Sequence, residues 1–421
     1  MIKARNPWWI VGACCLGVAC SAGPVNLWTF SVFLRPISDD LHVGRSVLAG
    51  AMLWTSVTGI LCAPLQGALL DRFGARRVLL IGTLFFAAIT AVQSTMTASF
   101  LVINALFILR GFGAAGPSPP SFAFVVTRWF DQRRGLALGI ALSGVGLGTA
   151  IIPPVAAYLI SNYSWRFAYI GVAVVVLILG GIPIALLVRE PDASERARMP
   201  HLAEAALPGF TLREALRSRR FWALASAFFL GIIVLNGTLT QIVAILMDRG
   251  VSLQAASSVL AASGVAAIAG RLLSGWCADR FYGPYVAIGF FTLLMLGTGL
   301  FGSGLTEPAP LIGALLCGIA NGAEVDLMSF FVSRYFGLKA FGKIMGTMFG
   351  IFVASTGIGP FISTKTFDLY HSYTPAFEFY EAILVIVLII FATLGPYPFP
   401  ARHGNARTAA AEEGQHEKAA A

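Results

Sequence analysis

Twelve apolar segments run along the sequence, separated by short polar connections. An α-helix rises about 1.5 Å per residue, so about 20 apolar residues cross the hydrocarbon core of a bilayer, which is roughly 30 Å thick. Each segment reaches that length, and we predict a membrane-spanning helix for each. The predicted spans cover residues 8–34, 46–70, 78–97, 100–127, 135–160 and 165–188 in the first half of the chain, and 220–246, 252–277, 284–304, 309–334, 341–366 and 375–397 in the second.

The composition excludes an ordinary soluble domain. Hydrophobic residues make up 57% of the 421 residues and charged residues only 12%, against about 25% charged residues in soluble proteins. The six cysteines all lie in apolar segments without paired spacing, so we expect no disulfide framework, no metal site and no cofactor. The sequence contains no G-x-S-x-G elbow, no P-loop and no H-E-x-x-H motif, which argues against an enzyme and against ATP-driven transport.

The positive charges indicate the membrane topology. A net charge of +9 would suggest a nucleic-acid partner for a soluble protein, but here we expect the partner to be the lipid bilayer and no nucleic acid. With the N-terminus in the cytoplasm, 22 of the 29 Lys and Arg residues lie in cytoplasmic segments and four face the outside. This distribution follows the positive-inside rule. We therefore expect a protein of the inner or plasma membrane with both termini in the cytoplasm.

The two halves of the chain are related by an internal repeat. The stretch GALLDRFGARR at 67–77 has a shorter copy, GWCADRF, at 275–281, and their Asp-Arg pairs are 208 residues apart. A second pair of similar stretches, RWF at 128–130 and RYF at 334–336, is 206 residues apart. Such spacing predicts two structural repeats of similar length.

A polar segment with three prolines separates the halves and predicts a linker. Within it, Thr211 and Glu214 have the spacing of a capping box, which predicts the start of a short helix. The Ala-rich, charged segment after residue 400 is expected to be a disordered tail. We therefore divide the chain into a first six-helix bundle at 1–188, a cytoplasmic linker at 189–219, a second six-helix bundle at 220–400 and a cytoplasmic tail at 401–421.

The pattern G-x-x-x-D-R-x-G-x-R-R between the second and third spans resembles the signature loop of the major facilitator superfamily. This resemblance implies an all-α membrane protein with twelve spanning helices in two bundles, acting as a monomer. It also assigns a gating role at the cytoplasmic face to the residues of this loop and of its copy. These residues are Gly67, Asp71, Arg72, Gly74, Arg76, Arg77, Asp279 and Arg280.

Other stretches resemble the monocarboxylate and oxalate/formate branch of that superfamily. They are SVFL at 31–34, SWRFAYIG at 164–171, TLREALRSRRFW at 211–222 and the pair Gly270-Arg271. Arg271 matches the intramembrane arginine that this branch uses to bind a carboxylate. Animal monocarboxylate carriers have a first-span lysine that falls near Trp28 here, so a lysine-centred mechanism does not carry over.

Two arginines lie inside predicted spans. A charge at the middle of a bilayer costs at least about 2.5–3.5 kcal/mol, so each is a candidate for a functional role. Arg110 either anchors the solute or couples to protons, or else it ties backbone carbonyls together. Arg271 offers a planar, always charged fork that suits a carboxylate, and its alternative role is an ion pair with Asp279 or with the tenth span.

Two carboxylates lie close to the middle of the tenth span. Glu324 and Asp326 are two positions apart, which is about 200° on a helix, so they should face nearly opposite sides. We predict Glu324 as the proton-coupling residue and Asp326 as a structural partner on a small-residue face, with Asp326 as the next candidate for the proton. Asn26, Trp28 and Asn236 could line a central cavity with the arginines, or could make hydrogen bonds between helices.

These features favour a secondary transporter that moves small organic anions of the monocarboxylate type by alternating access, in symport with protons. Two alternatives stay open from the sequence. One is an exporter or antiporter of another small solute, such as a drug or a cation, which the two intramembrane carboxylates would bind. The other is a sensor that binds a solute without moving it.

The topology can be tested by cysteine labelling. A cysteine at Ser38 should react with a membrane-impermeant maleimide added outside intact cells. A cysteine at Ser194 should react only after the cytoplasmic face is exposed, because it lies in the predicted linker. The reverse pattern would contradict the predicted orientation.

Overall fold

The structure is a computed structural model and describes residues 6–130, 134–189, 209–305, 308–337 and 339–399. Twelve of its helical segments are long and apolar enough to cross a membrane, which is the number that the sequence predicts. Eight helical residues, among them Gly67 and Asp71, are described by their backbone alone. The chain is thus an all-α, multi-pass membrane protein.

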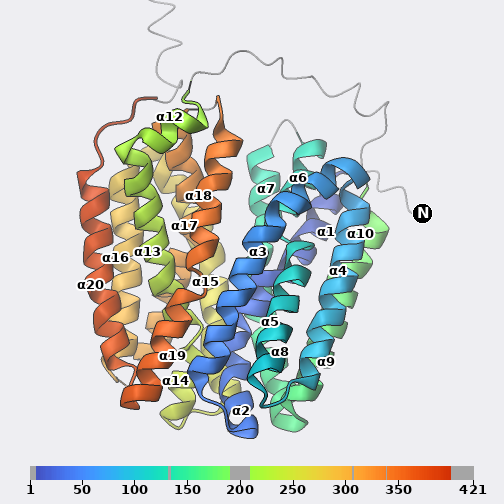
Figure 1. The fold of residues 1–421 in the computed structure, drawn as a ribbon. Helices are drawn as coiled ribbons and strands as arrows, with labels where there is room; N and C mark the ends of the chain where they lie inside the picture. Colours follow the sequence, from blue (N-terminus) through green and yellow to red (C-terminus); the bar gives the residue numbers. More distant parts are fainter. Residues whose placement is uncertain (1–5, 131–133, 190–208, 306–307, 338, 400–421) are drawn as a thin grey trace, which may run out of the picture.

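The first six spans form one bundle, which we call the first bundle (Figure 1). Their elements are α1 (Trp8–Ala19), η1 (Gly23–Trp28) and α2 (Phe30–Leu41); α3 (Arg45–Phe73); α4 (Ala75–Val92) and η2 (Gln93–Thr95); α5 (Phe100–Ala115) and α6 (Pro119–Trp129); α7 (Arg134–Leu142) and α8 (Gly144–Asn162); and α9 (Trp165–Val175), η3 (Val176–Gly181) and α10 (Ile182–Leu187).

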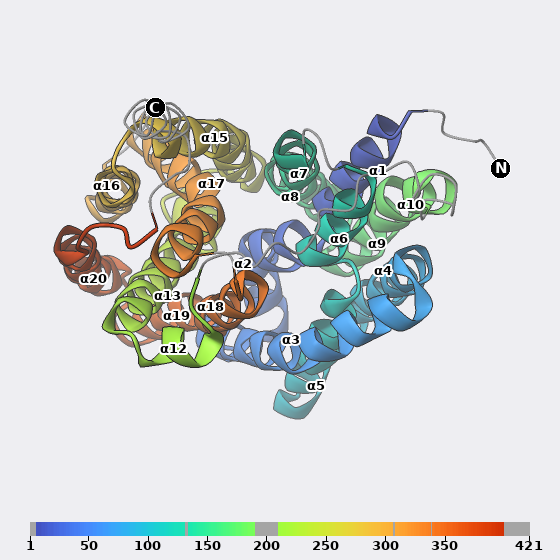
Figure 2. The ribbon, with the colours of Figure 1, turned by 90° about the horizontal axis from the view of Figure 1, so that it is seen from above.

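The last six spans form the second bundle, which lies beside the first (Figures 1 and 2). Its elements are α13 (Arg219–Leu239) and α14 (Ile242–Asp248); α15 (Leu253–Arg280); α16 (Gly283–Gly302); α17 (Ala309–Phe336); α18 (Phe341–Ser355) and α19 (Ile358–Tyr370); and α20 (Thr374–Thr393). The short helix α12 (Leu212–Arg217) precedes it.

The molecule has two ends, which we call the terminal end and the opposite end. At the terminal end lie α12 and the starts of α1 and α13, and at the opposite end lie α2 and α14 (Figure 1). Among the described residues, the hydrogen bonds and ion pairs that join the two bundles lie in the half of the molecule nearer the opposite end. Within the described part of the chain, these polar contacts therefore tie the bundles together near the opposite end.

Prolines and glycines interrupt several spans. In the π-helix η1, Pro24 has no N–H, and its carbonyl accepts hydrogen bonds from the N–H and the hydroxyl of Thr29. Between α5 and α6, the Gly116 carbonyl accepts a hydrogen bond from Gln66 at 3.0 Å. In a bilayer such irregular backbone is stable only where protein groups satisfy it.

The predicted capping box is present. The Thr211 hydroxyl accepts a hydrogen bond from the Glu214 N–H at 3.3 Å, and the Glu214 carboxylate accepts one from the Thr211 N–H at 2.7 Å. The bond from the Thr211 N–H lowers the pKa of Glu214 below its usual value, because it stabilises the ionised carboxyl group.

Three predicted span boundaries are wrong at the opposite end. The first span does not stop at residue 34 but continues as α2 to Leu41, and the eleventh continues to Tyr370. The seventh ends at Asp248, two residues beyond the prediction. These extensions carry polar residues that hydropathy excludes from a span. Arg35 of the first extension pairs with Asp248 of the seventh across the two bundles, and Asp368 of the eleventh accepts a hydrogen bond from the Ser46 N–H.

Glycines set the closest helix contacts in the second bundle. A Cβ atom at Gly270 of α15 would lie 2.8 Å from Ile319 Cα of α17, and one at Gly322 of α17 would lie 2.8 Å from the backbone nitrogen of Arg271. Real Cβ atoms do not come this close to backbone, so α15 and α17 could not pack as they do without these glycines.

The substitution Gly270→Ala should therefore destabilise the protein by roughly 1–3 kcal/mol, the usual cost of overpacking. Gly275→Ala in the same helix is the matched control, because a Cβ there meets nothing within 4 Å. We expect a lower Tm for the first variant alone when both are melted in detergent. Equal Tm values would show that the close approach of α15 to α17 contributes nothing to stability.

Candidate functional site

Arg110 of α5 lies in the interior of the first bundle and is only 3% exposed. Its Nη2 atom donates hydrogen bonds to the backbone carbonyls of Asn26 at 3.0 Å and Val25 at 3.2 Å. Both carbonyls belong to the π-helix η1, where the ordinary helical hydrogen-bond pattern is interrupted. The arginine thus stabilises the irregular turn of the first span. Its other terminal nitrogen, Nη1, is buried and has no hydrogen-bond partner among the described residues.

Other buried polar groups of the first bundle also lack partners in the described part of the chain. Among them are both amide atoms of Asn26, the indole nitrogen of Trp28 and the hydroxyl of Tyr169. Tyr169 of α9 faces the Arg110 guanidinium without meeting the geometry of a hydrogen bond. Buried polar groups are nearly always paired, so an unpaired group around a buried cation is typical of a ligand site.

Sequence analysis missed Tyr169. The signal was present, because Tyr169 belongs to the SWRFAYIG stretch that carries part of the family resemblance. Its ring stacks on Phe33 of the first span, with centroids 4.0 Å apart, and this contact holds the hydroxyl towards Arg110.

The second bundle contains an ion pair between its eighth and tenth spans. Arg271 Nε of α15 lies 3.7 Å from Asp326 Oδ2 of α17. The side chain of Asp326 is 33% exposed and lines a cavity of about 380 Å³, together with Ser274, Ser329 and Asp279. The cavity therefore extends from Asp279, in the last turn of α15, to Asp326.

Glu324 lies on another face of α17, as the 200° separation predicts. It is 3% exposed, and its Oε1 atom has no hydrogen-bond partner among the described residues. Its neighbours on that face, Met328 and Phe331, are fully buried in the aromatic core of the second bundle. Asn236 of α13 is also buried, and its Nδ2 atom is unpaired within the described residues.

The loop between the second and third spans gathers arginines at the terminal end. Arg72, Arg76 and Arg77 line a cavity of about 540 Å³ with Gly74, Arg128 and Arg189. Gly74 has φ +80°, a conformation that favours glycine, and it permits the tight turn between α3 and α4. Arg76 donates a hydrogen bond to the Ala185 carbonyl at 2.7 Å, which ties the third span to the sixth.

The other members of the predicted gating set are placed as follows. Gly67 and Asp71 lie in α3, and their side-chain environments are outside the described part of the structure. Asp279 and Arg280 form the last turn of α15, where the Arg280 guanidinium lies 4.4 Å from the Trp276 ring centroid. The structure keeps these residues at the terminal end, away from Arg110.

Sequence analysis also passed over Glu381, a carboxylate inside the twelfth span. It is half-buried in α20, and its Oε1 atom has no partner in the described residues. Among the described residues, no group of three His, Cys, Asp or Glu could hold a metal ion.

Comparison with known proteins places these features in a family. The sequence model of the Major Facilitator Superfamily matches residues 14–364. Monocarboxylate transporter 12 of Homo sapiens is 26% identical over 426 aligned positions, covering 92% of this chain and 80% of that protein. Monocarboxylate transporter 12-B of Danio rerio is 28% identical over 65% of this chain, and the match spans 62% of that protein, less than two thirds of its length.

Solved structures of transporters share the fold. A crystal structure of the nucleoside transporter NupG superposes with a TM-score of 0.73 at 14% identity, covering 92% of this chain and 99% of that one. The family match over most of the sequence and the twelve spanning helices agree. The chain belongs to the Major Facilitator Superfamily of membrane transporters.

Proposed function

We propose that this protein is a secondary transporter of small organic anions of the monocarboxylate type, working by alternating access in symport with protons. The superfamily membership and the similarity to monocarboxylate transporters support the substrate class. The charge distribution supports a cytoplasmic location for the terminal end, in the inner or plasma membrane.

The observation that carries the proposal is the ion pair between Arg271 and Asp326. In the empty carrier the two charges cancel, which makes them tolerable inside the membrane. When Asp326 takes up a proton, Arg271 loses its partner and can bind a solute carboxylate instead. When both the proton and the anion are bound, the charges of the pair and its ligands again cancel. The carrier can therefore change conformation either empty or with both ligands bound, which is symport.

The geometry favours Asp326 over Glu324 as the proton acceptor. Asp326 lines a cavity and forms an ion pair with Arg271, so a proton can reach Asp326, and its protonation removes the negative charge beside Arg271. Glu324 is enclosed among apolar side chains, and an isolated carboxyl group in such surroundings is far more stable neutral than ionised. We propose that Glu324 stays protonated through the cycle.

The first bundle supplies the other side of the solute site. Arg110 has one buried nitrogen to offer a carboxylate, and the unpaired groups of Asn26, Trp28 and Tyr169 can contact the rest of a polar solute. We propose that Asn236 contributes from the second bundle. A solute held between two bundles couples their movement, and the bundles divided by the segment 189–219 are the moving units.

One observation favours a second candidate. Asp279 and Asp326 line the same cavity, and two carboxylates could bind a cationic drug or metabolite on its way out of the cell. An uptake panel in vesicles separates the two functions. Radiolabelled monocarboxylates should accumulate under an inward proton gradient, and accumulation of cations alone would support the exporter or antiporter.

The proton site can be tested with two neutralising variants in the same helix. Asp326→Asn should abolish proton-driven accumulation of the solute but retain solute exchange, because the amide permanently mimics the protonated acid. Glu324→Gln is the matched control and should accumulate the solute as the wild type does. Both uptake and counterflow are measured in proteoliposomes.

The opposite result, with accumulation lost in Glu324→Gln and kept in Asp326→Asn, would move the proton site to Glu324. Accumulation by both variants would contradict coupling through this helix.

A further inference from the structure

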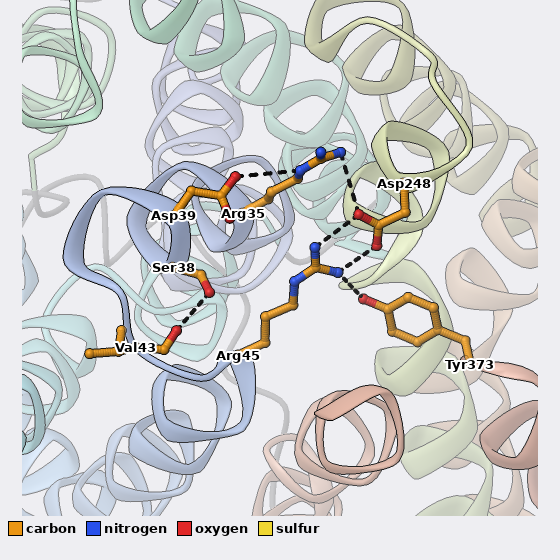
Figure 3. A network of polar contacts seen from close by, with 7 residues as sticks. All are labelled: Arg35, Ser38, Asp39, Val43, Arg45, Asp248 and Tyr373. Atoms are coloured by element: carbon orange, nitrogen blue, oxygen red, sulfur yellow. Dashed lines mark hydrogen bonds and ion pairs between the residues drawn. The ribbon is translucent and has the colours of Figure 1, made fainter. Parts of the chain in front are cut away.

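A cluster of charged residues joins the two bundles at the opposite end of the molecule (Figure 3). Arg45, in the first turn of α3, donates two hydrogen bonds to the Asp248 carboxylate at the end of α14, at 2.5 and 2.9 Å. A guanidinium nitrogen of Arg45 also donates to the Tyr373 hydroxyl at 2.7 Å. Arg35 of α2 approaches the same carboxylate at 3.4 Å. One carboxylate thus sits between two arginines.

The charges of this cluster are divided between the bundles. Both arginines belong to the first bundle, and Asp248 and Tyr373 belong to the second. The second bundle also contributes the Phe367 ring, 4.2 Å from the Arg45 guanidinium, and the Asp368 carboxylate, which accepts a hydrogen bond from the Ser46 N–H at 3.0 Å. Separation of the bundles at this end must therefore take the anionic partner away from both cations.

The ion pair between Arg45 and Asp248 is strong while this end of the molecule is closed. Two parallel N–H···O bonds between a guanidinium and a carboxylate are the preferred geometry for this pair, and Arg45 is only 8% exposed. Burial raises the pKa of Tyr373 to about 12, so its hydroxyl stays neutral, and Asp248 is the carboxylate of the second bundle that pairs with both arginines. Opening leaves Arg45 without its carboxylate partner, whereas Arg35 keeps Asp39 of its own helix at 3.5 Å. An arginine without a partner beside a second, only partly balanced arginine is a setting that attracts an anion.

We propose that Arg45 and Arg35 form a carboxylate-binding subsite at this end of the transporter, which Asp248 occupies while the end is closed and an entering solute occupies when it opens. Asp248 then acts as a built-in competitor of the solute. The inference rests on the proposed function in one respect, which is that the solute is an organic anion.

If the cluster were only a structural lock between the bundles, loss of Asp248 would still open this end, but an added carboxylate would have no effect on it. In both cases, loss of Asp248 favours the open state. Only a subsite predicts that a free carboxylate, added to the wild type, also favours the open state by replacing Asp248 on the arginines.

The experiment measures the distance across the opposite end by pulsed electron spin resonance in nanodiscs. Spin labels at Asn162 of the first bundle and Gln254 of the second report its opening, since both positions are exposed. Asp248→Asn should raise the ratio of long to short distances by about tenfold, within the usual range of coupling between sites. Acetate should raise the ratio in the wild type, and its neutral isostere acetamide should not.

Two variants locate the acetate effect. It should disappear in Arg45→Gln, which lacks the subsite, and persist in Arg271→Gln, which lacks the proposed central anchor. Asp40→Asn is the matched control for charge removal, because Asp40 pairs with Arg166 inside the first bundle at 2.7 Å and does not bridge the two. It should leave the distances as in the wild type.

The absence of an acetate effect in the wild type would overturn the subsite, whether or not Asp248→Asn opens the end. An acetate effect that survives Arg45→Gln but is lost in Arg271→Gln would also overturn it, while supporting the proposed function. The wild-type titration needs no substitution in the cluster, so it decides the question even if Asp248→Asn fails to fold.

Discussion

The cost of an unpaired charge or polar group in hydrocarbon is the constraint on which this structure depends. Arg110 can remain in the membrane because the π-helical turn of the first span exposes two carbonyls to it. Arg271 can remain there because Asp326 stands on the neighbouring helix. Among the described residues, Arg110 Nη1 has no hydrogen-bond partner, and Arg271 is paired with a carboxylate that can be protonated. We propose that these groups, which stabilise the fold, also receive the anion and the proton.

The same constraint governs the movement between bundles. The intramembrane pair lies within the second bundle, so we propose that movement of the bundles leaves it intact and that binding of a proton or an anion changes it. The pairs that do join the bundles are confined to the half of the molecule nearer the opposite end, among the described residues. Glycines at the contacts of α15 with α8 and α17 bring the helix backbones close together. A carrier built in this way can alternate between two arrangements of rigid parts.

Sequence patterns were sufficient for the features that depend on local order. Hydropathy predicts the twelve spans, the spacing of Thr211 and Glu214 predicts the capping box, and helical periodicity separates Glu324 from Asp326. Whether Glu324 or Asp326 contacts an arginine depends on how α17 is rotated relative to α15. A single sequence does not specify that rotation. The pair of Arg45 and Asp248 joins residues 203 positions apart, and a positive-inside count treats Arg45 only as a loop charge. The π-helix at Pro24 escaped prediction because its irregular backbone is stabilised by Arg110, from a distant span.

We propose that a proton takes the place of Arg271 on Asp326, and that the solute carboxylate takes the place of Asp326 on Arg271. The most direct measurement is the number of protons taken up when the solute binds, obtained by titration calorimetry in buffers of different ionisation enthalpy. The account predicts uptake of about one proton per solute molecule, near a pH where Asp326 is ionised in the empty carrier. Binding of the anion with no proton uptake at any pH would contradict it.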